Sequence, residues 1–171
     1  VLDFSNIIAG PVSGRVLAEF GANVTRVEAP SSVAGPRMTL WFGVDVNQGK
    51  RSLILDLKTA EGQGILSRLI QSADVVLHNS LDETAASLGL SHDQLAAINP
   101  NIVSCQVSAW GGPLGGRFKN DPAWDPVLQA ASGITTRYGT LEQPVHHGNP
   151  STVDFITGYS AALGIAQALV A

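Results

Sequence analysis

The sequence predicts an α/β fold in which helices cover a doubly wound parallel sheet. Its first residues read as a strand, a helix and a strand joined by tight turns, over Val1–Phe4, about Val12–Phe20 and Asn23–Val27. Short apolar strands then continue to alternate with helical segments. With 171 residues, 44% hydrophobic and 14% charged, the chain can bury a sizeable core. We therefore expect a single α/β domain over residues 1–171.

The remaining elements follow from apolar spacing and from turn residues. Further strands are predicted at Ser52–Leu57, Asp74–His78 and Ile102–Val107. Further helices are predicted from Thr59 to about Ser72, over Asp82–Leu88, over Ser91–Ile98 and from Asp125 to about Ser132. In the last of these, Asp125 is the expected cap, Pro126 the first helical residue and Gly133 the stop. Ala29–Gly49 and Ala109–Gly116 are predicted loops. The first is long enough to suggest a functional role.

Asp154 is the strongest candidate for a catalytic residue. It is the only charge at the head of the apolar segment Phe155–Ala171, which we expect to be a buried helix. A carboxylate in a first helical turn faces free N–H groups and the positive end of the helix dipole, so it should stay ionised and well oriented, as a nucleophile must. However, Ser151–Asp154 also has the form of a capping box, a purely structural device. Both interpretations remain open on the local sequence.

Composition and charge argue against several classes of protein. A net charge of −4 without a basic cluster argues against binding to nucleic acid or to an anionic membrane surface. The single cysteine, Cys105, allows no disulfide framework and no thiolate metal site, which suits a reducing, cytoplasmic location. His146 and His147 are adjacent but lack a third ligand, so we expect a solvated loop and no metal.

The sequence gives little support for a nucleotide cofactor. Gly10 and Gly14 do not complete the G-x-G-x-x-G pattern, although Glu28 lies about where a dinucleotide fold places its ribose-binding acid.

The chain begins without a secretory signal and ends inside a helix, so it has the appearance of a fragment.

Seven segments carry a resemblance to a known family. In order they are VLDFSNIIAGP, LAEFGANVTRVEAP, GKRSLILDLKTAEG, ADVVLHN, LAAINPNIVSCQVSAWG, PAWDPVLQAASG and PSTVDFITGYSAALGIAQAL. Together they resemble the family III CoA-transferases, which include formyl-CoA transferase, carnitine-type CoA-transferases and α-methylacyl-CoA racemase. The resemblance implies a Rossmann-like parallel sheet, the N-terminal portion of a chain roughly twice as long, and an interlocked homodimer.

The resemblance also implies a reaction. In the family's transferases an aspartate that matches Asp154 attacks an acyl-CoA thioester. A mixed anhydride and then an aspartyl-CoA thioester form, and a carboxylic acid acceptor finally leaves with the CoA. The CoA thioester is thus a substrate, and no separate cofactor is implied. The small carboxylic acid is not identified by the sequence.

Three further residues match family positions near CoA: Arg37, Asn79 and Trp124. Trp124 stands where the racemase branch has its second acid/base, a histidine, so a racemase-like isomerase is the less favoured alternative. Trp124 could wall the pocket or belong to the core. Where the family presents Phe-Arg-Pro-Gly, this chain has Ser80–Glu83, with two acids and no cation. A non-catalytic member that serves assembly is therefore a further alternative.

Overall fold

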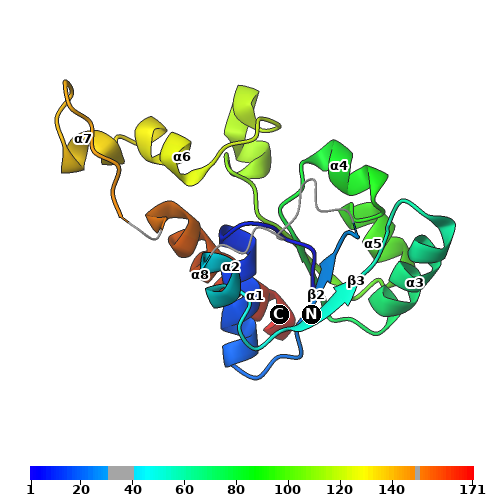
Figure 1. The fold of residues 1–171 in the computed structure, drawn as a ribbon. Coiled ribbons are helices and arrows are strands. Elements are labelled where there is room, and N and C mark those ends of the chain that lie inside the picture. Colours follow the sequence, from blue (N-terminus) through cyan, green and yellow to red (C-terminus); the bar gives the residue numbers. More distant parts are fainter. Residues whose placement is uncertain (31–40, 149–150) are drawn as a thin grey trace.

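The computed structural model describes residues 1–30, 41–148 and 151–171. Within these ranges five parallel strands form one sheet in the order β3-β2-β1-β4-β5 (Figure 1). The strands are β1 (Leu2–Asp3), β2 (Thr25–Glu28), β3 (Arg51–Ile54), β4 (Val75–His78) and β5 (Val103–Gln106). In the register, Leu2 lies opposite Thr25 on one side and Val76 on the other. The predicted doubly wound, Rossmann-like sheet is confirmed.

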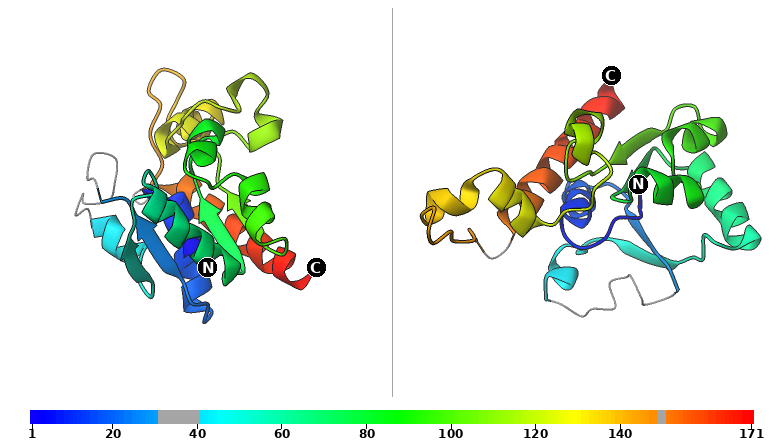
Figure 2. Two further views of the ribbon diagram at one scale, coloured as in Figure 1. Left: turned by 90° about the vertical axis from the view of Figure 1, so that its right-hand side faces the viewer. Right: turned by 90° about the horizontal axis from the view of Figure 1, so that it is seen from above.

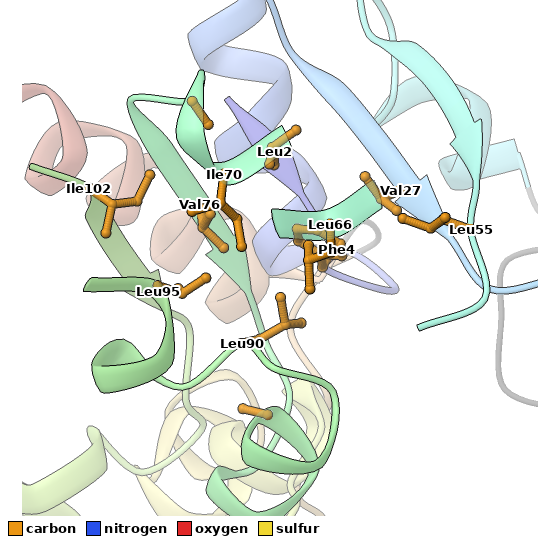
Figure 3. Close-up of a cluster of buried hydrophobic side chains, with 12 residues drawn as sticks. Leu2, Phe4, Val27, Leu55, Leu66, Ile70, Val76, Leu90, Leu95 and Ile102 are labelled. Carbon is orange, nitrogen blue, oxygen red and sulfur yellow. The ribbon is translucent and has the colours of Figure 1, made fainter. Parts of the chain in front are cut away.

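Helices cover both faces of this sheet (Figure 2). They are α1 (Ala9–Glu19), α2 (Trp41–Asp45), α3 (Ala60–Gln71), α4 (Asp82–Ser87), α5 (His92–Ile98), the 3-10 helix η1 (Gly112–Phe118), α6 (Asp125–Ala131), α7 (Ile134–Tyr138) and α8 (Thr152–Val170). Strand β4 is buried throughout, because helices pack on both of its sides. Val76 faces a core built with Leu66 of α3 and Leu95 of α5 (Figure 3), whereas Val75 and Leu77 face Ile165 of α8.

Three short helices depart from the sequence-based prediction. Trp41–Asp45, Gly112–Phe118 and Ile134–Tyr138 lie in segments predicted as loop or left unassigned. They are too short to show a helical apolar period, which is the signal that prediction depends on. The first helix also begins earlier than predicted, at Ala9, with Pro11 in its first turn, where its missing N–H costs nothing.

The expectation that the last helix is buried is wrong for most of its surface. Helix α8 buries Gly158, Ala162 and Ile165, but Ile156 and Leu163 are each 61% exposed. Its sequence is apolar on every side, so periodicity could not separate the packed face from the open one. Of the helices in the described ranges, α8 is also the one long and apolar enough to cross a membrane by length and composition.

Close packing of α8 on α1 depends on Gly158. A Cβ at Gly158 would lie 2.7 Å from the carbonyl oxygen of Ala9 and 2.7 Å from Cβ of Val12. We expect Gly158→Ala to lower the free energy of unfolding by about 1–3 kcal/mol, because the backbone oxygen of Ala9 cannot move aside. Gly164→Ala in the same helix meets no heavy atom within 4 Å and should stabilise by about 0.5–1 kcal/mol. Denaturant unfolding of both variants checks this, and equal effects would contradict it.

Candidate functional site

A cavity of about 380 Å³ lies at the carboxyl ends of the strands. From β1 the chain continues to β2 on one side of the sheet, and from β4 it continues to β5 on the other side, so the strand order reverses between β1 and β4. Such a switch point is where open α/β sheets bind ligands. The loops after β1, β4 and β5 line the cavity, and the start of α6 and the first turn of α8 close it from the far side. Figures 1 and 2 show α6 and α7 extending away from α3 and α5.

Asn79 joins the two loops that begin at this switch point. Its side-chain oxygen accepts a hydrogen bond from the N–H of Asn6 at 2.9 Å, and its side-chain nitrogen donates to the carbonyl oxygen of Asn6 at 2.9 Å. The residue after Asn6, Ile7, has a φ of 71°, a conformation that is rare for a β-branched side chain. The Asn79 amide therefore fixes a sharp turn at the cavity wall.

Asp154 lies half-buried on the cavity wall in the first turn of α8. Burial, followed by the negative charge of Asp125, raises the pKa of the Asp154 carboxyl from 3.8 to about 6. The helix terminus, on which the sequence-based expectation rests, favours the ionised form. Burial and Asp125 act in the opposite direction, yet the carboxylate form still dominates at pH 7.

The N-terminus of α8 is capped by Asp125, not by the residues beside it. Ser151 makes no side-chain capping bond. Instead, Oδ2 of Asp125 accepts from the N–H of Val153 at 2.7 Å and from the N–H of Asp154 at 3.2 Å. The capping-box interpretation of Ser151–Asp154 is therefore wrong. Asp125 is also not the cap of its own helix, because Trp124 holds that position and Asp125 is the first residue of α6.

His146 and His147 lie in a loop, as predicted, and His146 is exposed, but both residues also belong to the same hydrogen-bond network. Nε2 of His146 lies 3.1 Å from Oδ1 of Asp125, and the backbone of His147 exchanges two hydrogen bonds with the Gln129 side chain, at 2.9 and 2.8 Å. The His147 ring stacks on Tyr138. Sequence reasoning missed this network, because its members come from three separate segments.

The structure brings Asp154, Asn79 and Trp124 to one cavity. Trp124 is 61% exposed, so it walls the cavity and is not a core residue. Arg37 lies outside the described residues. Among the described lining residues Lys119 is the single cation, beside the acids Asp82, Asp121 and Asp154. No three His, Cys, Asp or Glu side chains of the described residues gather as a metal site.

A parallel α/β domain with a cavity at its topological switch point belongs to the class of α/β domains that bind ligands at the carboxyl ends of their strands. The sequence model of CoA-transferase family III matches residues 1–171. This chain belongs to CoA-transferase family III.

Individual relatives agree with this assignment. The chain is 37% identical over 169 residues to the CoA-transferase/lyase DddD of Marinomonas sp. (strain MWYL1), covering 99% of this chain and 20% of that protein. It is 30% identical over 185 residues to the succinate--glutarate CoA-transferase of Agrobacterium fabrum, covering 99% and 46%. A crystal structure of Rv3272 from Mycobacterium tuberculosis superposes with a TM-score of 0.87 at 36% identity, covering 99% and 48%. The chain thus spans about half, or less, of the length of these relatives.

Proposed function

We propose that the protein containing this chain transfers coenzyme A from an acyl-CoA donor to a carboxylic acid, with Asp154 as the nucleophile. The observation that supports this most is the place of Asp154, half-buried on the wall of the switch-point cavity. The names of the relatives, which include acetyl-CoA:oxalate CoA-transferase of Acetobacter aceti, support the same chemistry.

The proposed reaction balances without any further reactant. An Asp154 oxygen attacks the thioester carbonyl, and the CoA thiolate leaves as the mixed anhydride forms. The thiolate then attacks the Asp154 carbonyl carbon, which releases the first carboxylate and leaves an aspartyl-CoA thioester. The acceptor carboxylate repeats these two steps in reverse and departs as its CoA thioester, so that Asp154 is regenerated as a carboxylate.

Trp124 and Asn79 are proposed to contact CoA. Trp124 offers an exposed aromatic face on the cavity wall, and Asn79 fixes the loop on the opposite wall through Asn6. Lys119 alone supplies positive charge among the described lining residues. The CoA phosphates need charge-assisted bonds, so we propose that Arg37 provides one of them.

Trapping of the covalent intermediate tests this function. We expect the intact protein, incubated with a panel of acyl-CoAs and mild hydroxylamine, to gain a hydroxamate adduct that mass spectrometry maps to Asp154. Asp154→Ala should gain none. Glu142→Gln, which removes an exposed carboxylate outside the cavity, should react as the wild type does. No adduct with any donor, together with no CoA binding, would instead support a non-catalytic member of the family.

The acidic lining of the cavity is the observation that favours a non-catalytic member of the family, because Asp82 and Asp121 repel the phosphates of CoA. Asp82 lies in the first turn of α4, where it also accepts a hydrogen bond from Gln106 at 3.0 Å. A racemase-like isomerase is less favoured, since Trp124 cannot move a proton. Exchange of the α-proton of a branched acyl-CoA with solvent would instead favour the isomerase over the transferase.

We also propose that the intact protein is a cytoplasmic homodimer. The exposed apolar side chains of α8, among them Ile156 and Leu163, offer surface that a second copy of the chain can bury. The single cysteine, Cys105, suits a reducing compartment. An intact protein that sediments as a monomer at micromolar concentration would contradict the dimer.

A further inference from the structure

Asp125 is a buried carboxylate with an unusual set of partners. It is 2% exposed. One oxygen accepts from the N–H groups of Val153 and Asp154, at 2.7 and 3.2 Å. The other contacts the side chains of Gln129 and His146. Within the described ranges no lysine or arginine pairs with Asp125, and His146, whose side chain is 42% exposed, is its ion-pair partner only when protonated.

We propose that Asp125 is a positioning residue that pins the backbone of the nucleophile Asp154 and, through its buried negative charge, makes that nucleophile more reactive. The inference rests on the proposed role of Asp154. Its first part follows from the two N–H bonds, because they fix the first turn of α8 to α6 and thereby aim the Asp154 side chain at the cavity.

The second part follows from the charges of the reaction. Before attack, the half-buried carboxylate of Asp154 and the buried carboxylate of Asp125 lie near each other and repel. When Asp154 forms the anhydride, its negative charge passes to the CoA thiolate, and when the thioester then forms, the charge leaves with the released carboxylate. In both intermediates the Asp154 acyl group is neutral, and the repulsion from Asp125 disappears. Asp125 therefore raises the energy of the free carboxylate relative to the covalent intermediate. The raised pKa of Asp154 is consistent with this effect, although burial is its larger cause.

Other charged groups near Asp154 must be considered in any test that depends on pH. Lys119, Asp121 and Asp82 face the same cavity from other elements. His146 contacts Asp125 from the loop that precedes α8. Nδ1 of His147 lies 3.0 Å from the hydroxyl oxygen of Thr152, in the first turn of α8. A protonated His146 would partly neutralise Asp125 and so weaken its effect on Asp154.

Asp125→Asn in the intact protein tests the proposal, because asparagine keeps the shape and one acceptor but removes the charge. Isotope-edited infrared spectra are recorded over a range of pH, and the spectrum of the same protein carrying Asp154→Asn is subtracted from each of them. The difference reports the ionisation of Asp154 without any substrate. We expect its midpoint to fall by about half to one pH unit from about 6. The rate of hydroxamate formation at pH 8 should fall about tenfold. Glu142→Gln should change neither.

His146→Gln supplies an independent arm with the opposite sign. It leaves Asp125 in place, and its half-exposed site should tolerate the change. His146 is an ion-pair partner of Asp125 only when it is protonated, and replacing it then leaves the charge of Asp125 less compensated, so the Asp154 midpoint should rise by about a few tenths of a pH unit. Unchanged midpoints in both variants would overturn the proposal, and if Asp125→Asn fails to fold, His146→Gln decides alone. Absence of any adduct in the wild type, with the infrared shifts present, would instead overturn only the proposed function.

Discussion

Replacing Asp154 by asparagine is expected to abolish CoA transfer and, at the same time, to stabilise the protein at pH 7. The variant loses the nucleophile, so the covalent route is closed and transfer should drop by at least about a thousandfold. The stabilisation has a separate cause. The carboxyl is half-buried beside Asp125, and both burial and that charge oppose its ionisation.

The sign follows from proton binding in the two states. Because the pKa of Asp154 rises from 3.8 to about 6 on folding, the native protein holds a proton between these values that the unfolded chain has lost. The free energy of unfolding therefore decreases as pH rises from about 4 to about 6 and stays reduced above that range. At about 1.4 kcal/mol per pKa unit the full effect is about 3 kcal/mol, and solvent screening of this partly exposed group reduces it to about 1–2 kcal/mol.

Denaturant unfolding at two pH values measures this effect. Asp154→Asn should exceed the wild type in stability by about 1–2 kcal/mol at pH 7 and by little at pH 4.5. Glu142→Gln is the control, since its exposed carboxylate should shift stability by no more than about 0.5 kcal/mol at either pH. A gain that is the same at both pH values would contradict the role of ionisation.

The sheet was predictable from sequence because its signals are local. The run Val75–His78 is buried on both faces, and its first three residues read as an uninterrupted apolar strand. Thr59 caps α3 through a bond from the N–H of Gly62 at 3.0 Å, as its position before the helix predicts. Gly133 ends α6 with a φ of 78°, as expected for a glycine at that place. Each of these features depends on residues within one short window.

The candidate site was only partly predictable, because its key contacts join distant segments. Asp154, Asn79 and Trp124 were identified singly, and the parallel sheet brings their elements to one edge. The cap of α8 was misassigned, since the local pattern at Ser151 satisfies the capping-box rule while the real acceptor, Asp125, lies 28 residues before Val153. No short window of sequence contains both partners. The same reason explains why the His146 contact was missed.

A second pair of distant residues gives the other large prediction. Nζ of Lys50 lies 2.7 Å from Oδ2 of Asp3, and the two side chains are 1% and 0% exposed. Lys50 also donates to the carbonyl oxygen of Pro11 at 2.7 Å and to Oδ1 of Asn47 at 3.0 Å. Burial is the main influence on Lys50, and it lowers the pKa of the ammonium. Through its bonds to Asp3 and to the carbonyl oxygen of Pro11, Lys50 thus joins the end of β1 to the first turn of α1.

Lys50→Met is expected to lower the free energy of unfolding by about 3–5 kcal/mol, because it leaves the carboxylate of Asp3 buried without its partner. The double variant Asp3→Asn/Lys50→Met should recover part of this loss, since no uncompensated charge then remains inside. Lys58→Met, at an exposed position, is the matched control and should change stability by no more than about 0.5 kcal/mol. If Lys50→Met and Lys58→Met unfold at the same denaturant concentration, the ion pair does not hold β1 against α1. If the double variant proves less stable than either single one, packing and not charge is what Lys50 contributes.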